Sequence, residues 1–214
     1  MWDKAFSELF NIQTWSSEIR DILLTHNLGH IFAPNNNSCP ETVISQLKDS
    51  MNIKQNVDLK QQCLDKPKLR NYVQINDFGC KTPYLTIPMP FIYRKYLALT
   101  YLSNLPIRIE TGRYERPKID ANLRVCQVGC DSFCIEDEYH VLFSCTMYNN
   151  MRITWLGKIK KPENFQHLPA TQKLKIVLDS PLNVKITAQY LVDISNLRSK
   201  ILTKKTARIP GPFI

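Results

Sequence analysis

The feature that most constrains this chain is a dense group of cysteines in its second half. Four of the seven cysteines in the 214-residue sequence lie between positions 126 and 145, and His140 lies among them. In a reducing compartment such a group indicates metal binding before it indicates disulfides. We expect zinc to hold the segment 120–150 and only part of the fold, since the apolar stripes of the chain lie elsewhere.

The spacing of these residues fits a zinc tetrahedron, which takes four sulfur or nitrogen ligands. Cys126 and Cys130 can supply one edge, and His140 and Cys145 the opposite edge. The step from His140 to Cys145 exceeds one helical turn, so we expect the turn after His140 to loosen. Cys134 is a rival ligand that can replace Cys130, and the alternative is a free buried thiol at this position. Four protein ligands leave no position for water, which predicts a structural Zn²⁺.

An acidic run directly precedes the histidine. It consists of Glu136, Asp137 and Glu138. We expect a solvated turn here, and the alternative is a hydrogen-bond partner that orients His140 from behind.

The rest of the chain favours helices. Apolar residues recur at helical spacing over 15–28, 39–51, 91–105, 169–179 and 182–204, with Phe91, Ile92, Leu99 and Leu102 on one side of the third. Residues 53–70 read as a polar helix, and three prolines over 82–90 predict an extended connector. The expected fold is mostly α, with helical segments around a small irregular CCHC zinc-binding module. Its regions would be 1–82 (helical), 83–150 (a helix plus the module) and 151–214 (basic helices).

The net charge of +9 is concentrated behind the cysteines. Residues 151–214 hold 12 Lys and Arg but 3 Asp and Glu, whereas residues 1–150 hold 16 of each kind. This asymmetry indicates a polyanionic partner, and the alternative is a basic tail that only aids solubility. The expected phosphate contacts crowd the end of the final helix: Arg198, Lys200, Lys204, Lys205 and Arg208.

A second cationic segment precedes the cysteines and contains Tyr114. Its cations can bind phosphates while the ring stacks on a base. A structural role is the equal alternative, with Gly112 in a turn and Tyr114 packed against the metal module. The cations of this segment are Arg108, Arg113, Arg116, Lys118 and Arg124.

Two signals of other compartments are missing from the sequence. No stretch approaches the ~20 apolar residues of a membrane span. The first ten residues lack the apolar core of a signal peptide. We therefore expect an intracellular protein of the cytoplasm or nucleus, without a membrane partner.

Three stretches together resemble a known family. They are Ile-Glu-Thr-Gly-Arg-Tyr at 109–114, Arg-x-Cys-x-x-x-Cys at 124–130, and Ile-Glu-Asp-Glu-Tyr-His-Val-Leu-Phe-Ser-Cys at 135–145. They are similar to the C-terminal region of animal non-LTR (LINE-type) retrotransposon polyproteins, downstream of the endonuclease and reverse transcriptase domains. The resemblance extends more weakly over roughly residues 15–155. The family usually separates its first two cysteines by two residues, and here three intervene.

The resemblance implies a nucleic-acid-binding accessory module with Zn²⁺ on Cys126, Cys130, His140 and Cys145. Its partners would be element RNA or target DNA and the reverse transcriptase domains of a full-length element. We expect no enzymatic activity, because a polymerase palm needs an Asp-Asp turn and the sequence contains none. A structural or protein-interaction module and a nonfunctional retrotransposon relic stay open as alternatives.

Overall fold

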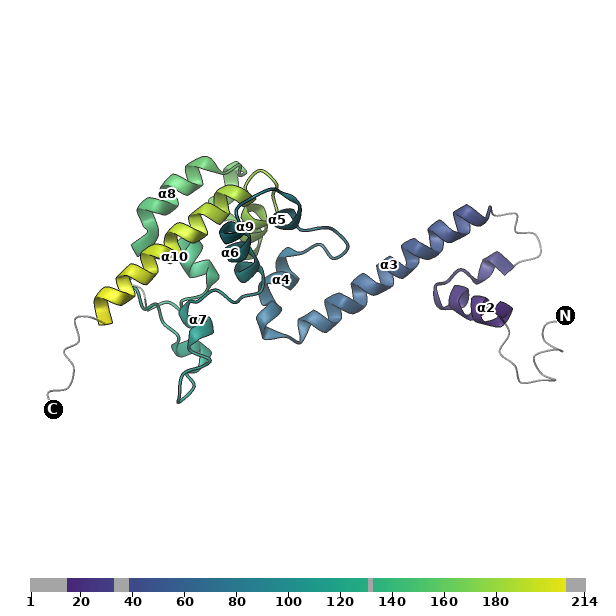
Figure 1. Cartoon of the computed structure of the whole chain (residues 1–214), viewed down its shortest axis with the longest axis horizontal. Coiled ribbons are helices and arrows are strands. Elements are labelled where there is room, and N and C mark those ends of the chain that lie inside the picture. The colour runs from purple at the N-terminus through teal and green to yellow at the C-terminus, as the bar shows by residue number, and fades with distance from the viewer. Residues whose placement is uncertain (1–14, 33–38, 131–132, 207–214) are drawn as a thin grey trace. The chain divides into compact units, whose positions relative to one another are not determined.

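The computed structural model describes residues 15–32, 39–130 and 133–206, and within these ranges it is mostly helical (Figure 1). The mostly α fold predicted from the sequence is confirmed. Among the described residues, β-pairing is limited to one antiparallel bridge, between Val125 and Ile135. None of the described helices is both long enough and apolar enough to cross a bilayer.

The chain divides into two compact units, residues 1–60 and 61–214. The boundaries expected at 82 and 150 both fall inside the second unit. The first unit contains α2 (Trp15–Thr25), η1 (Gly29–Phe32) and most of α3 (Pro40–Leu64). α2 ends before residue 28 because Asn27 adopts a left-handed conformation, with φ of 58°. The stretches 39–51 and 53–70, expected as separate helices, join in α3 as far as Leu64.

The second unit carries the remaining elements. They are η2 (Pro67–Leu69), α4 (Arg70–Ile75), α5 (Pro83–Thr86), α6 (Phe91–Tyr101), α7 (Arg108–Thr111), η3 (Ala121–Leu123), η4 (His140–Ser144), η5 (Thr146–Tyr148), α8 (Asn149–Lys158), η6 (Glu163–His167), α9 (Ala170–Leu178) and α10 (Val184–Thr206).

The core of this unit forms where α10 packs against α6, α8 and α9 (Figure 1). α10 contributes Val184, Ala188, Leu191 and Ile194, all nearly or fully buried. These residues are spaced by four, three and three positions, so they share one face of the helix. Burial of each Val, Leu or Ile side chain in this way stabilises the fold by about 1.5–3 kcal/mol. The two helices expected after the cysteines are thus present, as α9 and α10.

Two local expectations are wrong. The proline-rich stretch is not wholly extended, because Pro83 occupies the first turn of the short helix α5, where its missing N–H costs nothing. In α6 the buried face carries Leu97 and Tyr101, whereas Phe91 is 81% exposed. Ile92 and Leu102 are exposed as well. The Tyr101 hydroxyl donates to the Leu178 carbonyl at 3.1 Å, which fixes that face against α9.

Candidate metal centre

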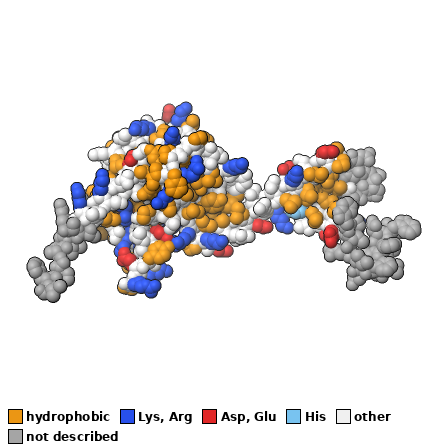
Figure 2. All heavy atoms as spheres, viewed as in Figure 1, with side chains coloured by type: hydrophobic (Ala, Val, Ile, Leu, Met, Phe, Trp, Pro, Cys, Tyr) orange, Lys and Arg blue, Asp and Glu red, His pale blue; other side chains and the backbone are white. Residues whose placement is uncertain are grey.

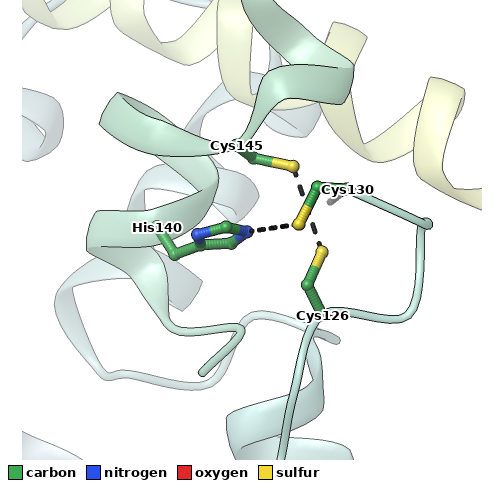
Figure 3. Close-up of side chains that lie close together, drawn as sticks. All are labelled: Cys126, Cys130, His140 and Cys145. Carbon is green, nitrogen blue, oxygen red and sulfur yellow. Dashed lines mark hydrogen bonds between the residues drawn. The ribbon is translucent and has the colours of Figure 1, made fainter. Parts of the chain in front are cut away.

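Three cysteines and one histidine converge in the second unit (Figure 3). The ligand atoms of Cys126, Cys130, His140 and Cys145 all lie within 4.8 Å of one another, so this group can hold a metal ion. The Sγ atoms of Cys126 and Cys145 are 3.9 Å apart, and Cys130 Sγ lies 3.4 Å from His140 Nε2. A disulfide needs about 2.05 Å between sulfurs, so these residues are free thiols. The rival ligand Cys134 is exposed and lies outside the group.

The first edge of the group is held by a short two-stranded turn. The Cys126 N–H donates to the Cys134 carbonyl at 3.0 Å, next to the bridge between Val125 and Ile135. Gly129, just before Cys130, has φ of +86°, a conformation that side chains rarely adopt. A Cβ at this position would also lie 3.0 Å from Lys205 Nζ. The glycine thus lets the loop reverse direction between its two thiols.

The second edge is held by a π-helical turn, η4. The Cys145 N–H donates to the His140 carbonyl at 2.7 Å, a hydrogen bond that spans five residues. The loosened turn expected from the spacing is present, and it places both side chains on the same side of the helix. Asp137 Oδ1 accepts the His140 backbone N–H at 2.8 Å and starts this turn.

Burial favours the uncharged forms of Cys126, Cys145 and His140. It raises the pKa of the Cys126 thiol to about 12 and also raises the pKa of Cys145. It lowers the pKa of His140, so the imidazole is neutral and its Nε2 can act as a ligand. Thiolates here therefore need a cation at the centre of the group, which is the charge that a metal ion supplies.

The acidic run is not a solvated turn, and that expectation is corrected. Glu136 is fully buried. Its carboxylate accepts two hydrogen bonds of 2.9 Å from Arg198 of α10 and a third from the backbone N–H of Arg108. A buried carboxylate persists only when it is paired in this way. Glu136 therefore connects the metal module to α10 and to the start of α7.

Two further buried glutamates extend the same pattern. Glu138 pairs with Arg70 of α4 at 2.5 Å. Burial raises the pKa of Glu138, and Arg70 opposes that effect. Glu110 lies 3.2 Å from Lys68 Nζ and 3.1 Å from Arg113 Nε. Sequence reasoning missed Arg70 and Lys68, because nothing in their spacing links them to glutamates several tens of residues away.

Two cations expected to contact phosphate are buried in the protein instead. Arg124 is 4% exposed and donates to the carbonyls of Ile109 and Ile119. Arg198 is 9% exposed and is engaged by Glu136. For these two residues the expectation is corrected, because their guanidinium groups already satisfy protein acceptors.

The other cations of both segments differ in exposure. Arg108 pairs with Glu115, and Arg113 pairs with Glu110. Tyr114 is 65% exposed, and its hydroxyl donates to Glu110 and accepts from Lys68. Arg208 lies outside the described residues. The cations that are exposed are Arg116, Lys118, Lys200, Lys204 and Lys205, the last donating to the Gln127 carbonyl at 2.8 Å.

Comparisons of the chain with protein-family models, curated proteins and solved structures find no match.

Proposed function

We propose that this chain is a zinc-stabilised helical module that binds nucleic acid through the basic, exposed side of α10. The zinc part rests on the donor set and its dimensions. In a zinc tetrahedron, two sulfurs lie about 3.8 Å apart and a sulfur and a nitrogen about 3.5 Å apart. The corresponding separations here are 3.9 Å and 3.4 Å. Three thiolates and one imidazole close the coordination shell, so the ion is structural.

The observation that carries the nucleic-acid part is the excess of positive charge in the second unit, which burial does not reduce. Residues 61–214 hold 23 Lys and Arg and 12 Asp and Glu. Three of those acids, Glu110, Glu136 and Glu138, are buried, and so are three arginines, Arg124, Arg152 and Arg198, so the excess of 11 positive charges lies among the other residues. The face in Figure 2 accordingly shows many Lys and Arg on this unit and few Asp and Glu. A surface of this kind attracts a polyanion.

α10 gives this charge a linear arrangement. It is 23 residues long, which corresponds to about 35 Å. Lys185, Gln189, Lys200 and Lys204 are exposed along it and lie four, eleven and four positions apart. These steps keep the four side chains on neighbouring parts of one side of the helix. Asp193 lies on the same side, where it accepts a hydrogen bond from Gln189. With three lysines and one acid this side keeps a net positive charge, and we call it the basic track, suited to a phosphate backbone.

The resemblance to retrotransposon polyproteins supports the same proposal and supplies its setting. In a full-length element the module would hold RNA or target DNA near the reverse transcriptase, and it would carry out no chemistry itself. The buried glutamates fit this role, because Glu136 and Glu138 connect the segment 123–145, which carries the candidate ligands and is called the metal loop here, to α10 and α4. These contacts hold the basic track in a fixed place.

A second candidate function, docking to a protein, is favoured by the outer side of the metal loop. Leu123, Val125, Phe133 and Ile135 are all exposed there, and Phe133 is 96% exposed. Val125 and Ile135 are bridge partners, so they point to the same side of the turn. Exposed apolar groups of this kind are more typical of protein contacts than of phosphate contacts.

The deciding experiment measures affinity against salt concentration. The parent protein and a Lys200→Gln/Lys204→Gln double variant are titrated with fluorescent RNA and DNA at several salt concentrations. We expect the double variant to bind more weakly and its log–log salt slope to fall by about 1.4 for single strands and about 1.8 for duplex DNA. The matched control is Lys66→Gln/Lys81→Gln, which removes equal charge from exposed positions outside α10. No measurable affinity of the parent at low salt would refute nucleic-acid binding and leave protein docking as the better account.

A further inference from the structure

A groove of about 450 Å³ opens between α6, α8 and α10. It lies along the N-terminal half of α10, whereas Lys200 and Lys204 lie in the C-terminal half. The groove contains none of the metal-ligand candidates and none of the phosphate contacts predicted from the sequence. Its lining combines aromatic and aliphatic side chains with two lysines: Tyr93, Met151, Thr154, Trp155, Lys158, Lys185, Ile186, Gln189, Tyr190 and Asp193.

The floor of the groove is apolar and largely aromatic. The rings of Trp155 and Tyr190 stack at 4.4 Å between centroids and 7° between planes. Both are nearly buried, at 3% and 4% exposure. Trp155 Nε1 also donates to Thr187 Oγ1 at 3.3 Å, which holds the indole in place. Tyr93 is only half-buried, so it is the lining ring most available to a ligand.

The rim of the groove is cationic. Lys158 ends α8 and Lys185 lies in the first turn of α10, and both are exposed. Among the described residues neither ammonium group has a carboxylate partner. The one acid in the lining, Asp193, accepts a hydrogen bond of 2.8 Å from Gln189. The groove thus combines an aromatic floor with a net positive rim.

We propose that this groove takes one unstacked nucleotide of a single-stranded nucleic acid, an inference that rests on the proposed function. The base would stack on Tyr93 over the apolar floor, and its flanking phosphates would meet Lys158 and Lys185. The volume suits one base with its sugar. A duplex keeps its bases stacked and paired, and removing one costs a few kcal/mol, so the groove selects single strands.

The position of the groove supports this occupant over a peptide. Gln189 on its wall lies 15 positions before Lys204, about 22 Å along α10, on the same exposed side of the helix. A strand seated in the groove can therefore continue along α10 to Lys200 and Lys204, at the other end of the basic track. A hydrophobic peptide would fill the floor but would leave the two lysines and the track without counter-charges.

The test uses the full chain, loaded with zinc, and a fluorescein-labelled single-stranded oligouridylate about 12 nucleotides long. Tyr93→Ala removes the stacking ring, and Tyr93→Phe keeps it as the matched control. We expect Tyr93→Ala to weaken binding at least fivefold, on the order of one lost stacking contact, with an unchanged salt slope. Tyr93→Phe should bind like the parent. Lys158→Gln/Lys185→Gln, at exposed positions that folding does not need, should weaken binding and flatten the slope by about 1.4.

Competition adds a second readout. We expect the parent to prefer the single strand over a duplex of the same length, and Tyr93→Ala to lose that preference. The groove proposal would be refuted if both Tyr93→Ala and Lys158→Gln/Lys185→Gln bound like the parent while Lys200→Gln/Lys204→Gln bound more weakly. The proposed function would then still stand. A different outcome is that the groove variants leave oligonucleotide affinity unchanged and reduce self-association, measured by sedimentation. That result would identify a second copy of the chain as the occupant of the groove and would also refute the nucleotide proposal. A parent without oligonucleotide affinity would mean that the proposed function itself is wrong.

Discussion

Glu136 and Arg198 form a buried ion pair across 62 positions of the sequence, with two hydrogen bonds of 2.9 Å between guanidinium and carboxylate. Glu136 lies four positions before the metal-ligand candidate His140, and Arg198 lies on the long basic helix α10. The pair therefore couples the metal module to the surface that we propose for nucleic acid.

The first prediction concerns this pair. Replacing Glu136 with Gln should destabilise the protein by about 3 kcal/mol, because a buried guanidinium loses its counter-charge. The double variant Glu136→Gln/Arg198→Met should be less destabilised than the sum of the single variants. Urea unfolding of all four proteins measures this, with exposed Glu163→Gln as the control. Simple additivity would show that the two side chains do not interact.

The second prediction concerns metal content. Elemental analysis of purified protein should find about one zinc per chain. Cys126→Ser, Cys130→Ser and Cys145→Ser should each lower that content, because each removes one of four converging ligands. Cys134→Ser is the matched control, since Cys134 is exposed and outside the group. Loss of zinc in Cys134→Ser with retention in Cys130→Ser would mean that the second ligand has been assigned to the wrong cysteine.

The third prediction concerns chelation. The sequence alone predicts that removing zinc affects only 120–150. The buried pairs of Glu136 with Arg198 and of Glu138 with Arg70 extend the expected effect to α10 and α4. Amide hydrogen exchange should therefore rise in α4 and around position 198 as well as in the metal loop, while most helical circular dichroism stays. Complete loss of helix on chelation would contradict a metal that supports only part of the fold.

The fourth prediction concerns acid stability. Burial raises the pKa of Glu110, but hydrogen bonds from Tyr114 and Lys68 and the charge of Arg113 outweigh it, so this pKa lies below its ordinary value. A carboxyl group with a lower pKa in the folded state contributes stability above its unfolded pKa of about 4.3. That contribution is lost as the pH falls through the folded pKa.

Unfolding of the parent and Glu110→Gln between neutral pH and pH ~3 measures this contribution. The gap in stability between the two proteins should be full at neutral pH and should shrink as the solution is acidified. The comparison cancels the acid sensitivity of the metal ligands, which both proteins share. A gap that stays constant over the whole range would show that the ionised form of Glu110 is not favoured by folding.

The sequence by itself determined the helical class and the group of four side chains that can hold a metal ion. Helices follow from the local spacing of apolar residues, and α9 and α10 lie close to where that spacing predicts them. The four ligands lie within 20 residues of one another, so their geometry is governed by local turns. The loosened turn between His140 and Cys145 is also predicted from the sequence. Two residues five positions apart point to different sides of an ordinary α-helix, so the turn has to widen for both to face one ion.

Only the tertiary structure decided which side of α6 is buried and which charges are internal. Leu97 and Tyr101 are buried because α10 packs against α6 and Tyr101 reaches Leu178 of α9. The sequence of α6 alone would allow the side of the exposed Phe91 to be buried equally well. Glu136 and Arg198 look like surface residues in the sequence. They are buried because each neutralises the other, and a carboxylate can leave water only where a partner of opposite charge meets it. A partner 62 positions away is brought there by the packing of α10, which no local pattern encodes.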